Sequence, residues 1–438
     1  MVKSSAAAGQ LQAFRGEILH FLDDPAVAGD QAWQYWADGL LLVEDGHIAA
    51  AGDAAELLPN LSEDVPLTHY RDALIVPGFV DTHVHFPQVE MIASGGEQLL
   101  DWLQQYAFPA EEKFADVRHA ERMAEFFLTQ LLRSGTTTAM VFGSVHPQSV
   151  EAFFTEAERR NLRMICGKVL MDRHVPESLR DTAESGCQQS RALIERWHGR
   201  GRLQYAVTPR FAASCSDAQL QSAGRLLREF PDVYMQTHLS ESEHEVVWVQ
   251  ELFPDSDHYL HVYEQYGLLG KRSVFAHGIH LCDSECQRLA DTQSSVAFCP
   301  SSNLFLGSGL FDLPQAQRFG FEVGLGTDVG AGTSLSLLQT MSDAYKVQQL
   351  RGDQLVAEKS FYMATLGGAR ALDLDAQIGN FQVGKEADFI VLDYNATPLL
   401  QLRMQQCRDI RERLFVFSIL GDDRAVAATH ILGQLFTD

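Results

Sequence analysis

The stretch Val76-Pro77-Gly78-Phe79-Val80-Asp81-Thr82-His83-Val84-His85 is an apolar run that ends in two histidines one residue apart. Alternate side chains of a β-strand point to the same side, so His83 and His85 are predicted to face one point together. Imidazole is a common ligand of protein-bound metal ions. The stretch therefore predicts a strand that ends in part of a metal site.

Outward from this stretch, short apolar runs alternate with amphipathic stretches. The runs lie at 75–82, 137–142, 163–171, 203–208, 233–237, 273–276, 295–298 and 322–326. The amphipathic stretches include 117–133, 178–198, 216–229 and 283–291. This alternation predicts an α/β protein with a parallel (β/α)8 barrel, and a doubly wound open sheet is the alternative. Polar residues recur at the ends of several runs, where barrel active sites lie, and this favours the barrel.

Both ends of the chain carry strand patterns of another kind. Residues 34–52 read as a hairpin around Glu44-Asp45-Gly46, because Asp-Gly is a strong signal for a tight turn. A strand at 387–392 and two more at 424–429 and 431–436 follow near the other end. We therefore predict a small composite β-sandwich domain from residues 1–76 and 381–438. The barrel domain then takes residues 77–380, and its segment 86–113 is a candidate lid.

Composition limits the partners and the compartment. The 438 residues carry a formal net charge of -24, which argues against a nucleic-acid partner. The seven cysteines are odd in number and form no Cys-x-x-Cys pair, so we interpret them as reduced thiols. The first residues lead into no apolar signal segment, and the apolar run 414–420 is too short to span a membrane. We expect a cytoplasmic protein that binds no membrane.

Three later runs also end in polar residues, namely His238, His277 and Asp328. His83, His85, His238 and Asp328 offer three imidazoles and one carboxylate, a set suited to zinc with one position left for water. Zinc lowers the pKa of such a water to about 7. Iron accepts similar ligands, so the identity of the metal stays open at this point.

Glu241 follows His238 by three residues and can reach the same cavity as a proton carrier. The alternative is a solvated glutamate at the start of a helix. We expect His277 to hold the attacking hydroxide and Asp328 to accept its second hydrogen bond. Lys168 could be a bridging ligand of a two-metal site. The fourth run, however, ends in Arg210 and not in a lysine, and this favours one metal.

Several further motifs give the sequence a resemblance to a known family. They are Phe86-Pro87-Gln88, Trp102-Leu103, Tyr106-Ala107-Phe108-Pro109, Thr136-Thr137-Thr138, Thr208-Pro209-Arg210-Phe211, His238-Leu239-Ser240-Glu241, Cys299-Pro300-Ser301-Ser302-Asn303 and Gly326-Thr327-Asp328-Val329-Gly330. Together with the His-x-His stretch, they resemble the amidohydrolase superfamily and, within it, the guanine deaminases, over almost the whole chain.

The resemblance implies an activity and roles for individual residues. It implies hydrolysis of guanine to xanthine and ammonia in purine catabolism, with one zinc ion per chain and a homodimeric assembly. The implied metal ligands are His83, His85, His238 and Asp328; the implied catalytic residues are Glu241, His277 and Asp328; and the implied substrate-binding residues are His85, Gln88, Arg210, Phe211, His238 and Glu241. The alternatives are a related deaminase acting on another purine, a pterin, cytosine or a triazine, a two-metal hydrolase, and a scaffold without activity.

Overall fold

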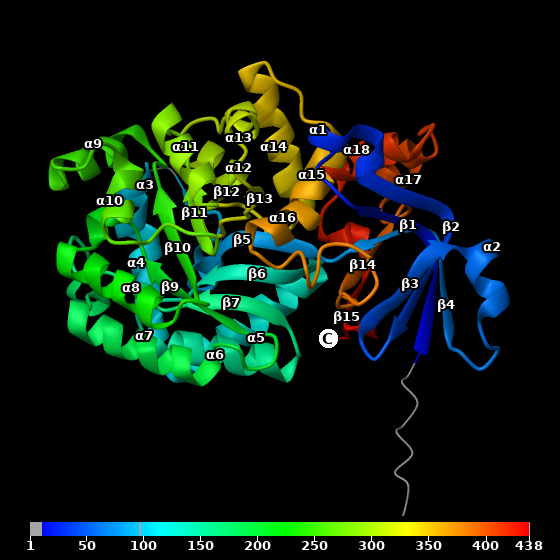
Figure 1. The fold of residues 1–438 in the computed structure, drawn as a ribbon, viewed down its shortest axis with the longest axis horizontal. Helices are drawn as coiled ribbons and strands as arrows, with labels where there is room; N and C mark the ends of the chain where they lie inside the picture. Colours follow the sequence, from blue (N-terminus) through cyan, green and yellow to red (C-terminus); the bar gives the residue numbers. More distant parts are fainter. Residues whose placement is uncertain (1–10, 96–97, 438) are drawn as a thin grey trace, which may run out of the picture.

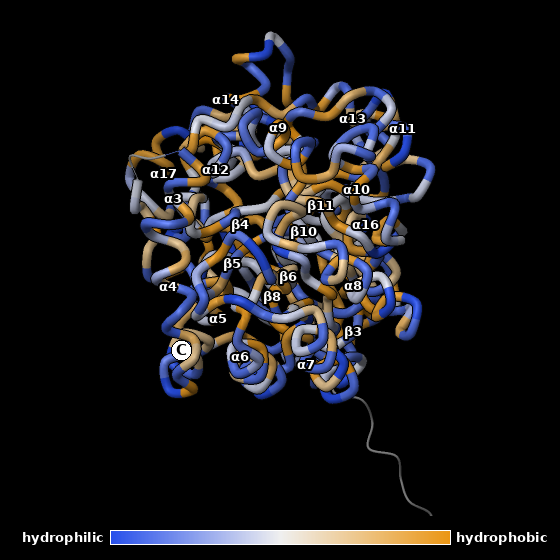
Figure 2. Tube along the Cα trace, turned by 90° about the vertical axis from the view of Figure 1, so that its left-hand side faces the viewer, coloured by the Kyte–Doolittle hydropathy of each residue, from blue (hydrophilic) through white to orange (hydrophobic). Residues whose placement is uncertain are grey.

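The computed structural model of the chain describes residues 11–95 and 98–437. Figure 1 shows two parts side by side, a barrel of strands covered by helices and a smaller sheet built from both ends of the described chain. In Figure 2 the apolar segments gather in the interior and the polar segments lie mostly on the outside. The first residues of the predicted sandwich, 1–10, lie outside the described residues, as do Gly96 and Glu97 of the candidate lid and the last residue.

Within the described residues, eight parallel strands form the barrel in chain order. They are β5 (Phe79–His85), β6 (Thr136–Phe142), β7 (Arg163–Gly167), β9 (Gln204–Pro209), β10 (Tyr234–Leu239), β11 (Ser273–His277), β12 (Ser295–Phe298) and β13 (Val323–Leu325), and the short β8 (Val169–Leu170) adds to β9. Where the first strand meets the segment after the last, the N–H of Asp328 donates to the carbonyl of His83 at 2.9 Å. The N–H of His85 donates to the carbonyl of Val329, also at 2.9 Å. These bonds bring the ends of the sheet together, and the predicted (β/α)8 barrel is confirmed.

Helices cover the outside of the barrel (Figure 1). They are α5 (Val117–Arg133), α6 (Pro147–Arg159), α7 (Ala183–Trp197), α8 (Asp217–Glu229), α9 (Glu243–Leu252), α10 (Tyr259–Gln265), α11 (Asp283–Asp291), α12 (Pro300–Phe305), α13 (Leu313–Phe319), α14 (Leu337–Arg351), α15 (Ala357–Met363) and α16 (Leu366–Ala371). The predicted helices at 117–133 and 283–291 are present with those bounds. The helix predicted over 178–198 begins later, at Ala183, because the Thr182 side chain accepts from the N–H of Ser185 at 3.0 Å and caps it there.

The segment between β5 and α5 is mostly helical. It contains the 3₁₀-helix η3 (Phe86–Met91), α3 (Leu99–Trp102), the π-helical turn η4 (Leu103–Ala107), α4 (Phe108–Glu112) and the 3₁₀-helix η5 (Lys113–Ala115). Trp102 Nε1 donates to the carbonyl of Ser94 at 2.6 Å and ties two turns of the segment together. The segment lies against the end of the barrel that carries the histidines, and its movement as a lid stays a prediction.

The smaller part is, in the described chain, one seven-stranded sheet in the order β16-β15-β14-β4-β1-β2-β3. Its strands are β1 (Leu11–Phe21), β2 (Trp33–Glu44), β3 (His47–Asp53), β4 (Leu67–Pro77), β14 (Phe389–Asp393), β15 (Val426–Ile431) and β16 (Gln434–Leu435). The short α1 (Pro25–Ala28) and α2 (Ala54–Leu57), and the longer α17 (Pro398–Met404) and α18 (Ile410–Leu420), lie between them in the chain. The edge strand β3 also bonds to the segment before β14, with the N–H of Ile48 donating to Lys385 at 2.7 Å and that of Ala387 to Gly46 at 2.8 Å. The sheet therefore curls around a core in which the Phe389 and His430 rings stack. We propose domain boundaries at 76/77, one residue before the end of β4, and at 380/381, in the segment before β14.

Two buried arginines tie the sheet to the barrel. Arg163, at the start of β7, donates through Nε to Glu386 at 2.7 Å. Arg202, just before β9, donates to Glu386 at 2.7 Å and to Asp388 at 2.8 Å. Buried charges are tolerated when each one has such partners. Because both arginines lie at the starts of barrel strands, the sheet docks at the end of the barrel opposite to the histidines.

No helix in residues 11–95 and 98–437 has both the length and the apolar character needed to cross a membrane.

Candidate active site

The end of β5 is fixed by a buried aspartate. Asp81 lies on the same side of the strand as His83 and His85, because alternate residues share a side. Its Oδ1 accepts from the backbone N–H of His83 at 3.2 Å and of Thr327 at 3.1 Å. Burial raises the pKa of Asp81 to about 6. These bonds join the strand end to the loop after β13, so the histidines and Asp328 are held at a fixed separation.

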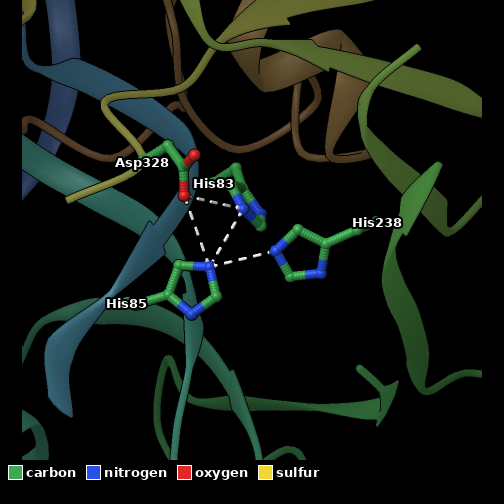
Figure 3. Close-up of side chains that lie close together, drawn as sticks. All are labelled: His83, His85, His238 and Asp328. Carbon is green, nitrogen blue, oxygen red and sulfur yellow. Dashed lines mark hydrogen bonds and ion pairs between the residues drawn. The ribbon is translucent and has the colours of Figure 1, made fainter. Parts of the chain in front are cut away.

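Four predicted metal ligands converge at the carboxyl ends of the strands (Figure 3). His85 Nε2 lies 3.2 Å from both His83 Nε2 and His238 Nε2. Asp328 Oδ1 lies 3.2 Å from His83 Nε2 and 3.3 Å from His85 Nε2. One ligand atom from each of the four side chains lies within 4.8 Å of all the others. The sequence predicted that these residues, from the ends of three different strands, lie together, and the structure brings them together.

The chemistry of this group fits a metal ion. His238 Nδ1 donates to the carbonyl of Arg210 at 2.6 Å, which leaves the Nε2 lone pair directed at the centre. Burial lowers the pKa of His85 to about 4 and that of His238 well below its ordinary value, so both rings are neutral. Burial alone would raise the pKa of Asp328, but the adjacent His83 and His85 hold it well below the usual range. Neutral imidazoles and an ionised carboxylate are the forms that bind a divalent cation.

Two of the site residues occupy an unusual backbone conformation. His277, the last residue of β11, has φ 74°, and Asp328, after β13, has φ 49°. Residues other than glycine rarely adopt this left-handed region, and such strain concentrates at functional sites. The conformation turns both side chains inward: His277 Nε2 lies 3.8 Å from Asp328 Oδ2, on the side of the carboxylate away from His83 and His85.

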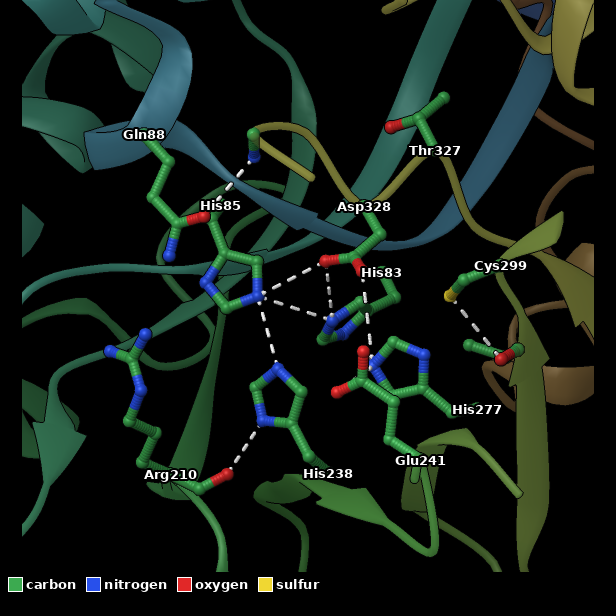
Figure 4. Close-up of polar contacts among 12 residues, drawn as sticks. His83, His85, Gln88, Arg210, His238, Glu241, His277, Cys299, Thr327 and Asp328 are labelled. Carbon is green, nitrogen blue, oxygen red and sulfur yellow. Dashed lines mark hydrogen bonds and ion pairs between the residues drawn. The ribbon is translucent and has the colours of Figure 1, made fainter. Parts of the chain in front are cut away.

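The side chains of His277 and Glu241 lie next to each other (Figure 4). His277 Nε2 lies 3.4 Å from Glu241 Oε2. Asn303 Nδ2 donates to His277 Nδ1 at 2.9 Å, so the ring carries its proton on Nε2 and directs it at the carboxylates. Burial lowers the pKa of His277 to about 3, which keeps the ring neutral. The ring is therefore a donor that stays in one protonation state.

Glu241 has the properties of a proton carrier. Its side chain is 4% exposed. Burial, and then the negative charges of Asp328 and Glu245, raise its pKa well above the ordinary value. Glu245, in the first turn of α9, accepts from the N–H of Glu241 at 2.8 Å and from Tyr259 at 2.7 Å. Glu245 thus positions the backbone of Glu241, a role that the sequence analysis missed although Ser242-x-x-Glu245 is a capping-box pattern.

A pocket opens from these groups towards the segment after β5. Apolar side chains form much of its wall, namely Leu99, Trp102, Leu103, Phe211, Leu306 and Ala331. Gln88 and Arg210 supply polar groups to the same wall, next to His85 and His238. An apolar slot with a few polar groups is the usual form of a site for a small planar molecule. The residues predicted to bind substrate therefore lie around one pocket, beside the candidate metal ligands.

Glu111 is the main residue of this region that the sequence analysis missed. Its carboxylate accepts from Arg210 Nη1 at 2.8 and 2.7 Å and from Gln88 Nε2 at 2.8 Å. Gln88 Oε1 accepts from the N–H of Gly330 at 3.2 Å. The spacing could have identified Glu111, because it lies three residues from both Phe108 and Phe114, on the buried face of the helical segment.

Lys168 lies outside the metal-ligand group. Its Nζ forms an ion pair with Asp181 and donates to the carbonyl of Val169 at 3.1 Å. Cys299 lies near His277 and Asp328, but burial raises the pKa of its thiol well above the ordinary value and keeps it protonated. Cys282 is exposed on the outside. Ligand atoms of Cys299, His277 and Asp328 also lie within 4.8 Å of one another, but metal binding there would require the thiolate, which burial disfavours.

Comparison with known proteins then gives the family. A model of the amidohydrolase family matches residues 74–436. The chain belongs to the amidohydrolase family. This amidohydrolase is 51% identical over 428 residues to the guanine deaminase of Escherichia coli K12, with 97% of each chain covered. The predicted hydrolase and the predicted resemblance are confirmed.

Solved structures are also similar to this amidohydrolase. The structure of E. coli guanine deaminase has a TM-score of 0.95 at 51% identity, covering 98% of this chain and 99% of that one. A guanine deaminase from C. acetobutylicum, solved with guanine bound in its active site, has a TM-score of 0.88 at 28% identity, covering 98% of this chain and 100% of that one. The shared architecture thus extends over the barrel and the smaller sheet together.

Proposed function

We propose that this amidohydrolase deaminates guanine, giving xanthine and ammonia, with one zinc ion per chain. The observation that carries the proposal is the pocket in which Gln88, Arg210 and Phe211 lie beside His85 and His238. The similar E. coli protein is named a guanine deaminase, and the C. acetobutylicum structure has guanine in its active site. Both names support guanine over the other ring systems that sequence analysis left open.

The pocket residues match the chemistry of the base. Guanine is neutral, planar and rich in hydrogen-bonding groups. Gln88 offers an amide edge that both donates and accepts, and Arg210 offers planar donors for a purine carbonyl. Phe211 offers an aromatic surface on which the ring can pack. These three contacts orient the carbon that bears the exocyclic amine towards Glu241 and His277.

The residues that would hold zinc are His83, His85 and His238 through Nε2 and Asp328 through Oδ1. The metal, when bound, supplies a Lewis acid that lowers the pKa of the attacking water. Iron would accept the same ligands, so metal analysis belongs to the test of the proposal.

The protein's own side chains transfer the protons and hydrogen-bond the reacting groups. Glu241 takes a proton from the attacking water, whose oxygen bonds to the carbon that bears the amine. His277 donates from Nε2 to that oxygen, and Asp328 Oδ2 accepts its remaining hydrogen bond. Glu241 then delivers its proton to the amine, the carbon–nitrogen bond breaks, and ammonia leaves. One water is consumed for each ammonia, and Glu241 returns to its starting state.

The test is ammonia release from a panel of purines, pyrimidines, a pterin and a triazine, with protein of measured metal content. We expect rapid release from guanine and about one zinc per chain. Zinc-loaded protein that releases ammonia from another member of the panel and not from guanine would transfer the proposal to that substrate. A metal content near two per chain would instead support the two-metal alternative.

Three further expectations remain proposals of the same kind. They are a homodimeric assembly, a cytoplasmic location and a place in purine catabolism.

A further inference from the structure

Glu111 lies behind the two polar residues of the base pocket. It belongs to α4, and its side chain is 1% exposed. Its carboxylate accepts two hydrogen bonds from Arg210 and one from Gln88, at 2.7 to 2.8 Å. The Arg210 guanidinium also lies over the Phe108 ring, 5.2 Å from the centroid. Glu111 therefore acts on the ligand through the residues that it holds.

The first consequence of the contact between Glu111 and Arg210 is electrostatic. A guanidinium in an apolar wall needs a counter-ion, because an isolated buried charge is strongly unfavourable. Glu111 is that counter-ion for Arg210, and both of its oxygens accept from one nitrogen, Nη1. In the described residues, Nε and Nη2 of Arg210 have no hydrogen-bond partner. Arg210 can therefore donate to a ligand while its positive charge is already balanced.

The second consequence is orientational. The Gln88 amide donates from Nε2 to Glu111 at 2.8 Å and accepts at Oε1 from the N–H of Gly330 at 3.2 Å. A flipped amide would bring two acceptors together at Glu111 and two donors together at Gly330. The unflipped orientation is therefore strongly preferred. Gln88 offers its second N–H and its second lone pair to a ligand in a fixed order.

We propose that Glu111 is a positioning residue that makes the pocket select a neutral purine over its anion. This inference rests on the proposed function and adds that the pocket discriminates between ligands by their charge. Guanine is neutral near pH 7, whereas the product, xanthine, is an imide-type acid that loses a proton close to neutrality. A pocket with an uncompensated arginine would retain that anion. With Glu111 in place, the pocket binds the substrate and releases the ionised product.

Other ionisable groups face the pair and enter the design of the test. His85 and Glu241 line the pocket together with Arg210, and His146, outside the pocket lining, interacts electrostatically with Lys168, Glu111 and Glu112. Burial lowers the pKa of His146 below its ordinary value and that of His85 to about 4, so both rings stay neutral near pH 7. Glu241 is shared by every variant below, so comparison between variants cancels its titration.

The experiment compares zinc-loaded wild type, Glu111→Gln and the matched control Glu112→Gln. Glu112 is the next residue in α4, and it accepts from Ser178, away from Arg210. Inhibition by xanthine is measured at about pH 6.5 and about pH 8, on either side of its ionisation, with hypoxanthine as an inhibitor that stays largely neutral. In wild type and in Glu112→Gln, xanthine is expected to inhibit more weakly at the higher pH.

In Glu111→Gln, xanthine at about pH 8 is expected to bind about tenfold more tightly than it binds to wild type. Inhibition by hypoxanthine should change much less, and kcat/KM for guanine should fall through KM more than through kcat. Wild type that binds xanthine more tightly at the higher pH overturns the inference, as does a Glu111→Gln variant with the wild-type trend. If Glu111→Gln fails to fold, Glu111→Asp keeps the charge and must keep the wild-type trend. Absence of guanine turnover by wild type would refute the proposed function separately, and direct calorimetric binding of the two inhibitors would then decide the role of Glu111.

Discussion

Replacement of Glu241 by glutamine tests the proposed chemistry most directly. The amide has nearly the same volume as the carboxylate and can keep the contacts that Glu241 makes, 3.4 Å to His277 and 3.5 Å to Ser308. It cannot take a proton from water or give one to the amine. The substitution also removes a buried negative charge from beside Asp328 and Glu245, which relieves repulsion within the site. Metal retention and folding are therefore expected to survive.

The size of the loss follows from the two proton transfers assigned to Glu241. One positioned acid or base contributes about 10² to 10⁴ in rate. Because the same carboxyl group acts in both transfers, we expect kcat for guanine to fall by about 10³ to 10⁴. At about 1.36 kcal/mol for each factor of ten, this is a loss of about 4 to 5.5 kcal/mol of transition-state stabilisation.

The assay is ammonia release at saturating guanine, with the metal content and the thermal unfolding curve of each preparation measured alongside. The matched control is Glu243→Gln, because Glu243 is exposed in the first turn of α9 and has no contact with the site. It should retain the wild-type rate. A Glu241→Gln enzyme with full metal content and a rate within about tenfold of wild type would refute the assigned role.

Three other expectations follow from the structure. Asp328→Ala should lose most of its metal on dialysis under conditions in which wild type keeps it, measured by metal analysis; full retention would contradict its role as a ligand. Arg202→Met should lower the free energy of unfolding by about 3 kcal/mol, because it leaves the buried Asp388 carboxylate without its partner, and an unchanged melting curve would contradict this reasoning. Burial lowers the pKa of both His20 and His430 to about 4, so below pH 6.5 the unfolded chain binds protons that the folded chain does not. Stability should be fully present above that pH and fall towards pH 4, by up to about 1.4 kcal/mol per pH unit for each ring, and His430→Gln should reduce the slope measured by urea unfolding.

The barrel could be predicted because its strands are buried on both faces. Such strands read as short apolar runs bounded by polar residues, and the runs at 137–142 and 295–298 correspond closely to β6 and β12. The first run, 75–82, predicts one strand, but it contains the end of β4 and the start of β5. The chain passes from one sheet to the other at Gly78, where a Cβ atom would lie 2.1 Å from Thr137 Oγ1. The Pro-Gly pair signalled a break, but only the packing of Thr137 makes the glycine necessary.

The convergence of the four candidate metal ligands could also be predicted, because the strand ends of a barrel converge on one face. The residues that support the neighbouring pocket and proton-transfer side chains could not. Glu111, Glu245 and Asn303 lie on helices and act through contacts with side chains far away in the sequence. Glutamates in helical segments are usually solvated, and their burial depends on which segments the fold brings against them. Local pattern identifies the groups that face the ligand better than the groups that hold them in place.

The position of β4 in the smaller sheet has a consequence for synthesis on the ribosome. β4 pairs with β1 on one side and with β14 on the other, and β14 begins only at Phe389. The N-terminal strands emerge first, so one edge of β4 has to wait for a partner while the entire barrel is translated. An open strand edge is a template for pairing with other chains. Nascent chains that stall before Phe389 should therefore be substrates for chaperones or aggregate, whereas completion of the C-terminal strands closes the edge and ends this vulnerable period.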